Sequence, residues 1–491
     1  MNSPLLPRND TLRAVCEMLQ AHPEPLYLVG GYIRDQLLHI ESHDLDFAVD
    51  GPAIPLARRI ADRFNGSFVL LDREHDAARA ILDDGRVCVD VARLRGADIV
   101  ADLQARDFAM NAIALHVRDV ARIPPPLIDP LRGQDDIAAR LIRATSERAF
   151  RDDPLRLLRA VRQSATLCFA ITPQTESWMR RDAHLIQIAA SERVQDELVR
   201  LFRCPGMAAH VADLHALGLL PHILPELDPL PCLTLPTIAA LEEMLSAVVD
   251  DTAPAAAHLD RQLVAALTPH RQMLASHLAQ VLSADRDRRV LLRFAALLHE
   301  IGEPQAMSVA DNKRCLNPAA QVLQRLRFSN VEVRIGARIV AHQRQPLELT
   351  RQETLSSRDC YRFFRQHGDD GPDILCLSLA TNQAHGLPAQ SPPLWARLLE
   401  TTSALLGYYH AEWPRVRAAP RLLDGQDLIR ALGLRPGPRL GRLLEALDEA
   451  QAVGEVATRD EALAWIRAHG NKLACSVKAK SPQSGQSQSS P

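Results

Sequence analysis

Residues 26–49 read LYLVGGYIRDQLLHIESHDLDFAV, and this stretch decides how the first part of the chain is expected to fold. The apolar run 26–29 has the length of a buried strand, the pair Gly30 and Gly31 interrupts it, and 32–38 has the apolar spacing of a helix. Glycines between a strand and a helix let the backbone approach a ligand closely. They also direct the free N–H groups of the helix N-terminus toward that ligand, which suits a phosphate.

Two carboxylates follow on the next apolar run, residues 44–49. Residues two apart in a strand point to the same face, so Asp44 and Asp46 are expected together on one face, with Leu45 and Phe47 toward the core. Carboxylates about 6–7 Å apart repel each other, and Mg²⁺ offsets this repulsion while it also holds substrate phosphates. The pattern predicts Mg²⁺-assisted nucleotidyl transfer. The alternative is a loop in which both aspartates only cap or meet solvent.

The composition of the 491 residues is that of a globular chain, with 47% apolar residues. No segment approaches the ~20 apolar residues of a membrane span, and the N-terminus lacks the basic and apolar regions of a signal peptide. The nine cysteines form no CxxC pair, which indicates cytoplasmic thiols and neither a zinc site nor a disulfide framework. The net charge of −3 does not decide on RNA, because an RNA binder needs only one basic face.

A second polar cluster lies in residues 102–115. The guanidinium of Arg106 offers a planar fork to phosphate oxygens. Asp107 and Asn111 are four residues apart, one helical turn, so they are expected to share a face and to hold sugar hydroxyls or each other.

Two of these segments resemble a known family. GGYIRD at 30–35, followed by DLDF at 44–47, resembles the head motif of the class II tRNA nucleotidyltransferase and bacterial poly(A) polymerase family. ARDFAMNA at 105–112 resembles the family motif RRDFTINA, with Ala105 in place of the first arginine. The resemblance places an acidic residue at Asp90, which would be the third catalytic carboxylate beside the metal-binding pair; the alternative is an ion pair with Arg93 or Arg95.

The segment DDPLR at 152–156 resembles the family motif EDxxR, in which the acid and the arginine read the base edge of the incoming nucleotide. An aspartate accepts from the amino group that C and A share, and an arginine donates to ring acceptors. Asp153 and Arg156 are three apart and are expected on one helix face. Asp153 before Pro154 is equally typical of a helix N-cap, and both roles are compatible.

The resemblance implies a nucleotide site built from glycines and polar side chains: Gly30, Gly31, Arg34, Asp35, Arg106, Asp107, Asn111, Asp153, Arg156, Arg159 and Arg162. The catalytic carboxylates would be Asp44, Asp46 and Asp90, with Mg²⁺ on Asp44 and Asp46. Residues 191–198 resemble the next family motif, and the arginine-rich segment 415–442 resembles the family region that holds the tRNA body. RNA contacts are therefore expected from Arg193, Arg435, Arg439 and Arg442, with a solvated arginine-coated face as the alternative for the tail.

The segment LLHEIG at 297–302 resembles the core of HD-type metal phosphohydrolases, with Glu300 where that core has Asp. Such a site needs several His and Asp ligands from separate helices, and neither the upstream nor the downstream sequence supplies them. We expect a degenerate HD scaffold used for packing, in which His299 is a core histidine.

The sequence as a whole predicts an α+β fold, with a nucleotidyltransferase head of small mixed β-sheet and helices followed by an all-α neck, body and tail. The expected boundaries are 1–145 for the head, 146–215 for the neck, 216–355 for the body, 356–474 for the tail and 475–491 for a disordered end. The resemblance implies a cytoplasmic enzyme that adds C and/or A from CTP and ATP to tRNA 3′ ends, with no membrane or DNA partner. The alternatives are a poly(A) polymerase, an HD phosphohydrolase and an RNA-binding module without activity.

The connection between Asp90 and Arg106 spans only 16 positions. Family members that build the whole CCA end carry a flexible, arginine-bearing loop here, which acts as a lever when the site changes from CTP to ATP. A connection this short has little reach for a lever. The hypothesis is that the enzyme adds the two C residues and stops.

Overall fold

The computed structural model describes residues 9–42, 44–250, 260–301, 317–352, 354–433 and 435–475. The contacts divide the chain into two compact units, Met1–Pro231 with Arg325–Phe328, and Cys232–Gln324 with Ser329–Pro491. The predicted head and neck both fall within the first unit. The finer division of the second unit into body and tail stays a prediction, and the expected disordered end lies, apart from Cys475, outside the described residues.

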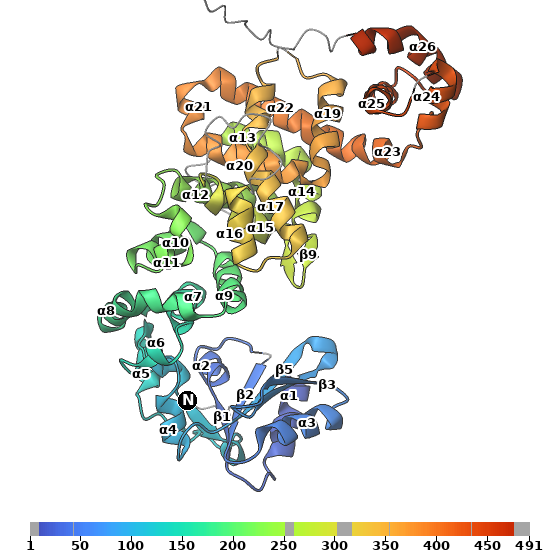
Figure 1. Cartoon of the computed structure of the whole chain (residues 1–491). Helices are drawn as coiled ribbons and strands as arrows, with labels where there is room; N and C mark the ends of the chain where they lie inside the picture. The colour runs from blue at the N-terminus through green and yellow to red at the C-terminus, as the bar shows by residue number, and fades with distance from the viewer. Residues whose placement is uncertain are drawn as a thin grey trace, which may run out of the picture. The chain divides into compact units, whose positions relative to one another are not determined.

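A six-stranded mixed sheet forms the centre of the head, in the order β3-β4-β5-β2-β1-β6 (Figure 1). Strand β2 pairs with β5 in parallel, and the other neighbours are antiparallel. The strands are β1 (Leu26–Val29), β2 (Asp44–Val49), β3 (Ser67–Asp72), β4 (Ala77–Leu82), β5 (Val87–Arg93) and β6 (Ala114–His116). The mixed sheet expected from the sequence is confirmed.

Alternation along β2 separates the core from the polar face of the sheet. Leu45 and Phe47 are buried, as predicted, whereas Asp44 is exposed. On the apolar side, α3 packs against β4 and β5 through buried Leu56 and Ile60. The other head helices are α1 (Asp10–Leu19), α2 (Gly31–Leu37), α3 (Ala53–Arg63), α4 (Ile99–Gln104) and α5 (Gly133–Ala139).

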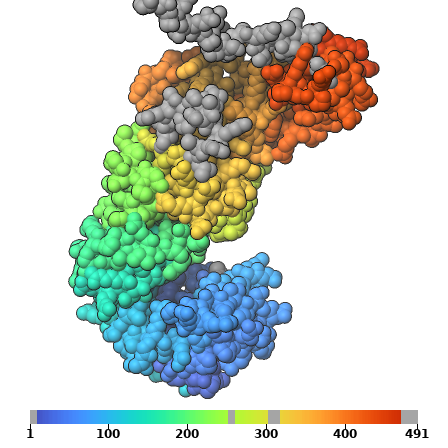
Figure 2. All heavy atoms as spheres, viewed as in Figure 1, coloured from blue at the N-terminus to red at the C-terminus, as the bar shows by residue number. Residues whose placement is uncertain are grey.

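The neck is a set of helices that continues the first unit, and the space-filling view shows head and neck as one continuous surface (Figure 2). The helices of the first unit after the head sheet are α6 (Ala149–Asp152), α7 (Arg156–Leu167), α8 (Pro173–Asp182), α9 (Ser191–Arg203), α10 (Met207–Ala216) and α11 (Leu220–Ile223), with the short parallel pair β7 (Leu141–Ile142) and β8 (Ala170–Ile171). Helix α7 packs against α9 along its apolar face, where Leu158 and Val161 are buried. This packing also brings Arg159 and Arg162 of α7 to Glu197 of α9.

The second unit is helical apart from the hairpin β9 (Val281–Ser283) and β10 (Arg286–Asp287), among the residues that the structure describes. Its central helix is α20, which is buried from Gly371 to Thr381 and is covered by α12, α15 and α17. The helices are α12 (Thr234–Leu245), α13 (Arg261–Leu267), α14 (Arg271–Leu278), α15 (Arg288–Leu298), α16 (Pro318–Arg325), α17 (Asn330–His342), α18 (Gln345–Leu349), α19 (Ser357–His367), α20 (Gly371–Ala384), α21 (Leu387–Gln390), α22 (Pro392–Ala411) and α23 (Trp413–Ala418).

The last three helices, α24 (Gly425–Leu432), α25 (Pro438–Ala452) and α26 (Arg459–Cys475), enclose a small apolar core of their own. Leu428, Leu443, Leu447 and Ile466 are fully buried in it. Within the described ranges, no helix combines the length and the apolar character that crossing a membrane requires.

Candidate active site

The carboxylates of the head gather where β2 and β5 run side by side. The parallel register pairs Asp46 with Asp90 and Asp44 with Cys88, so both predicted strand aspartates share a face with Asp90. Burial, together with the nearby charge of Asp90, raises the pKa of Asp46 to about 6. A carboxylate that is buried beside a second negative charge is stabilised by any cation that reaches it.

Asp90 is engaged by an arginine from the neighbouring strand. Arg79 on β4 lies opposite Asp90, and its Nε and Nη2 donate to the two carboxylate oxygens at 2.6 and 2.8 Å. The alternative prediction, an ion pair of Asp90 with Arg93 or Arg95, was wrong in its partner. The partner follows from the antiparallel register of β4 and β5, which places residues eleven apart side by side.

The glycine turn lies directly against the carboxylate pair. Gly30 has a left-handed φ of 77°, and a Cβ there would lie 3.0 Å from Asp46 Oδ2 and 3.3 Å from Arg106 Nη1. Only glycine combines this conformation with this spacing. Arg106 is fixed by Asp102, whose Oδ2 accepts from its Nε at 3.0 Å. The turn therefore brings the predicted phosphate ligand Arg106 to the metal-binding candidate Asp46.

Arg34, the arginine of the glycine segment 30–35, faces the motif at 105–112. Arg34 Nε and Nη2 donate to Asp35 Oδ1 at 2.8 and 2.7 Å, and Nη1 donates to Asn111 Oδ1 at 2.8 Å. Burial raises the pKa of Asp35, although the charge of Arg34 opposes that effect. Arg34, held by Asp35, thus binds the side chain of Asn111. Both Arg34 and Asp35 lie on α2, which begins at Gly31.

Asp107 and Asn111 hold each other, as one of the predictions had it. Asn111 Nδ2 donates to Asp107 Oδ1 at 3.0 Å, and Arg159 Nη2 donates to Asp107 Oδ2 at 2.8 Å. Burial acts to raise the pKa of Asp107, but Arg159 and the hydrogen bonds outweigh it and lower the pKa to about 2. The expected α-helical turn was wrong: Asp107 is followed by a single 3₁₀ turn, Ala109–Asn111, which closes the same contact.

Two neck residues of this network had not been predicted. Gln163 is 4% exposed, and its Oε1 accepts from Asn111 Nδ2 at 3.1 Å. Glu197 on α9 accepts from Arg162 Nε at 2.5 Å and lies 3.9 Å from Arg159. The available signal was spacing: Gln163 follows Arg159 by four residues and so lies on the same face of α7.

Arg156 is placed differently from its prediction. It is 7% exposed, and its guanidinium donates to the backbone carbonyls of Ala105 at 2.8 Å, Ala149 at 3.2 Å and Arg106 at 3.3 Å. These bonds join the neck to the loop that carries Arg106. The fork is occupied by main-chain oxygens, because the bend before α7 turns Arg156 toward the head.

Asp153 precedes α7 in an extended conformation, so it does not share a helix face with Arg156, and that prediction was wrong. Its Oδ1 accepts from the N–H of Leu155 at 3.1 Å and so caps the turn at 154–155 that leads into α7, whose own N-cap position is Leu155; the predicted N-cap is thus displaced by two residues. Its Oδ2 accepts from Arg193 Nη2 at 3.1 Å, so this candidate RNA ligand is ion-paired in the structure. The remaining candidates, Arg435, Arg439 and Arg442, are exposed in the second unit.

The side chain of His299 is buried where the end of α15 packs against α12. Its Nδ1 lies 2.8 Å from the carbonyl oxygen of Ala296, and its Nε2 lies 3.3 Å from Thr237 Oγ1. Burial lowers the pKa of His299. The prediction of a core histidine is confirmed. Neither here nor elsewhere in the described ranges do three or more His, Cys, Asp or Glu side chains cluster as metal ligands would.

The donor set at the head nevertheless fits a divalent cation bound together with a substrate. Arg79 neutralises Asp90, whereas Asp44 is exposed and Asp46 has a raised pKa beside it. Two carboxylates on one strand face supply part of an oxygen coordination sphere, and substrate phosphates and water complete such spheres for Mg²⁺. The arrangement suits charge neutralisation at a phosphate group.

Three stretches of the chain match known family models. Residues 26–143 match the Poly A polymerase head domain, 168–230 the probable RNA and SrmB-binding site of polymerase A, and 416–466 the putative tRNA nucleotidyltransferase domain 2. The first match covers the sheet with Asp44, Asp46 and Asp90, and the last covers α24, α25 and the first part of α26.

Curated relatives match over almost the full chain. The A-adding tRNA nucleotidyltransferase of Deinococcus radiodurans is 34% identical over 466 residues, which are 91% of this chain and 96% of the relative. The CC-adding tRNA nucleotidyltransferase of Geobacter sulfurreducens is 32% identical over 444 residues, 90% and 91% of the two chains.

Solved structures share the fold. A CCA-adding enzyme in complex with ATP superimposes with a TM-score of 0.62 at 19% identity, over 93% of this chain and 92% of that chain. The Thermotoga maritima CCA-adding enzyme complexed with tRNA superimposes with a TM-score of 0.57 at 19% identity, over 93% and 94%. The α+β fold with a nucleotidyltransferase head is thereby confirmed.

Proposed function

The chain belongs to the tRNA nucleotidyltransferase family, and we propose that it adds C and/or A residues from CTP and ATP to the 3′ ends of tRNA. The observation that carries the proposal is the contact of the Gly30 turn with Asp46 and Arg106. A turn with room for a ligand, a carboxylate pair and a fixed guanidinium are the parts that nucleotidyl transfer needs at a triphosphate.

In the proposed reaction the terminal 3′ hydroxyl of the RNA attacks the α-phosphate of the nucleotide, the new phosphodiester bond forms, and pyrophosphate leaves. Asp44 and Asp46 would hold Mg²⁺, which neutralises phosphate charge when it is bound. Arg106 would bind phosphate oxygens as a planar fork. Asn111, held by Asp107 and Arg34, would position the sugar.

Nucleotide choice is assigned to Asp153. Its Oδ1 keeps the bond from the N–H of Leu155. Its Oδ2 gives up the bond from Arg193 and accepts instead from the amino group of the incoming base. Arg156 supports this site by fixing the backbone of Ala105 and Arg106. Arg159 and Arg162 hold Asp107 and Glu197, so we assign them to the support of the nucleotide site.

The extent of addition is the finer part of the proposal. Between β5 and Arg106 the chain has only a turn and the six-residue helix α4, which Asp98 caps through the N–H of Ala101 at 2.9 Å. Asp102 Oδ1 accepts from the N–H of Arg95 at 3.0 Å. A short, internally bonded connection supports an enzyme that adds CC and stops. The relatives reported above include both a CC-adding and an A-adding enzyme, so the A-adding activity is the competing outcome.

The second candidate function is poly(A) polymerase, favoured by the match of residues 26–143 to a head domain of that name. The two are separated by incubating the purified chain and Mg²⁺ with labelled CTP or ATP and either a tRNA that lacks its 3′ end or an unrelated RNA. Addition of one to three residues to tRNA alone is expected. Long adenosine tracts on both RNAs would instead establish the polymerase. Free thiols at Cys16, Cys88, Cys168, Cys204, Cys232, Cys360 and Cys376 are in keeping with the proposed cytoplasmic location.

A further inference from the structure

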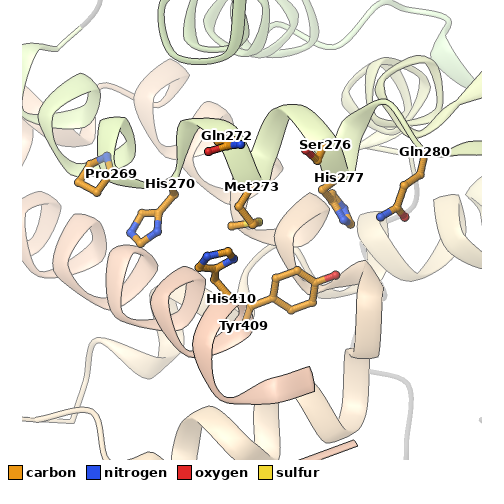
Figure 3. A pocket seen from close by; sticks show the side chains of 9 residues that line it. All are labelled: Pro269, His270, Gln272, Met273, Ser276, His277, Gln280, Tyr409 and His410. Carbon is orange, nitrogen blue, oxygen red and sulfur yellow. The ribbon is translucent and has the colours of Figure 1, made fainter. Parts of the chain in front are cut away.

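A cavity of about 430 Å³ lies in the second unit, remote in sequence from every residue of the active site. It is lined by α14 with the residues on either side of it, and by Tyr409 and His410 at the end of α22. Figure 3 shows Met273 and His277 on one side, with the rings of Tyr409 and His410 across from them. Cavities of this size hold small organic ligands.

His277, one of the residues that line the cavity, has a buried ring nitrogen without a partner among the described residues. His277 is 2% exposed, and its Nε2 lies 2.8 Å from Asp373 Oδ2. The carboxylate accepts from Nε2–H, so Nδ1 is the ring nitrogen left for another partner. Nδ1 is buried with no hydrogen-bond partner among the described residues. An unpaired ring nitrogen of this kind needs an explanation, and a ligand N–H supplies one.

The charged groups behind His277 pair with one another. Arg288 Nη1 donates to Asp373 Oδ2 at 2.7 Å and to Asp370 Oδ1 at 3.3 Å, and Arg338 Nη1 donates to Asp370 Oδ2 at 2.7 Å. Two guanidinium groups therefore face two carboxylates. These four charges cancel, so the charged groups behind His277 do not select an anion.

Gln280 lines the same cavity and offers a hydrogen-bond donor. Gln280 Oε1 accepts from Arg288 Nε at 3.2 Å, which fixes the amide and leaves its NH₂ group as a donor. Each nucleobase presents a donor next to an acceptor on its pairing edge. Unpaired bases also stack on aromatic side chains, and Tyr409 and His410 supply two rings at the cavity.

We propose that this cavity binds one unpaired nucleobase, with its edge on His277 and Gln280 and its face against Tyr409 or His410. The base comes from a free nucleotide or from an RNA bound to the chain. Only the second source rests on the proposed function. A base-binding site at this place would give the second unit a specific contact in addition to exposed arginines.

The test is hydrogen exchange of the α14 amides in the full chain, with AMP, CMP or a tRNA that lacks its 3′ end as probes. At least one probe is expected to slow exchange over residues 271–278. Gln280→Glu keeps the oxygen that Arg288 needs and removes the NH₂ donors, so it is expected to weaken the Kd of that effect about tenfold. Gln324→Glu, an exposed residue of α16, is the control for the added charge.

Protection by AMP or CMP identifies a free nucleotide as the source, and protection by tRNA alone identifies an RNA base. The proposal is overturned if no probe protects α14, or if Gln280→Glu and Gln324→Glu give the same Kd. His277→Phe provides a second variant that removes Nδ1 and keeps a ring. Extension of tRNA in the same preparations reports on the proposed function independently, because that reaction belongs to the first unit.

Discussion

Asn111 of the head donates to Gln163 of the neck helix at 3.1 Å, and this bond completes a hydrogen-bond network that the sequence motifs did not predict. Gln163→Leu has a similar volume but leaves an N–H of Asn111 without an acceptor in a buried site, at a cost of about 1–3 kcal/mol. We expect KM for the nucleotide to rise about tenfold while kcat changes less, because the sugar-positioning residue loses one of its supports.

Gln163→Glu is the matched control, since it retains the acceptor oxygen and is expected to stay close to the wild type. Steady-state kinetics with CTP and ATP measure both variants. An unchanged KM in Gln163→Leu would make Gln163 a packing residue only.

Loss of either strand aspartate should abolish nucleotide addition. Asp44→Ala or Asp46→Ala is expected to lower the rate at least about 10³-fold, which corresponds to the several kcal/mol that charge neutralisation by a metal contributes. Asp44 is exposed, so its replacement leaves the fold intact. Exposed Asp62→Ala on α3 controls for the lost charge. Incorporation of labelled nucleotide into tRNA is the measurement, and a rate near that of Asp62→Ala would refute the two-carboxylate mechanism.

The positions of Asp153 and Arg156 predict different defects. Arg156→Ala removes the donors of three backbone carbonyls and should lower the free energy of unfolding by about 3 kcal/mol. Asp153→Ala should mainly blur the choice between CTP and ATP, with about 1 kcal/mol lost at the cap. Asp153→Asn keeps the cap oxygen and separates the two effects. Competition assays and urea unfolding report them, and intact selectivity in Asp153→Ala would leave only the cap.

Local pattern was enough for the sheet and not for the pairing across it. The strand at 26–29 and the strand at 44–49 were predicted with the observed ends, because an apolar run stops at Gly30 and resumes after a polar loop. The partner of Asp90 could not be predicted, since Arg79 reaches it only through the register of two antiparallel strands. Registers depend on the turn and on the packed face.

The active site shows the same limit. The contact of Asp107 with Asn111 was predicted from a spacing of four, although a 3₁₀ turn produces it. The burial of Arg156 depends on carbonyls of Ala105 and Ala149, which a motif does not represent. Side-chain type and spacing identify which residues meet, whereas the fold decides which of their atoms remain free for a substrate.

Acid should destabilise the second unit through His367. This side chain is 1% exposed, and burial, with His342 and Arg338 nearby, lowers its pKa to about 3 from 6.5. Between these values the unfolded chain binds a proton that the folded chain does not bind. Stability is therefore full above pH 6.5 and falls as the pH drops, by up to about 1.4 kcal/mol per pH unit.

His367→Phe keeps the ring contacts with Phe363 and His342 and should flatten the dependence of the urea midpoint on pH between 6.5 and 5. The exposed His215→Ala is the control and should keep the wild-type slope. Equal slopes in both variants would show that another group is responsible.

The short connection before Arg106 predicts where synthesis stops. Arg95 and Asp98 are each bonded to α4 or its N-terminus, so this segment has no free length with which to follow a change of nucleotide. Three tRNA substrates, ending at the discriminator base, at C and at CC, should be extended by two, one and no residues when CTP and ATP are present together. Sequencing of the 3′ ends measures each product. Efficient addition of A to the tRNA that ends in CC, with none to the other two, would assign the A-adding activity. Complete CCA ends on all three substrates would show that the short connection does not limit addition, while the transferase assignment would stand.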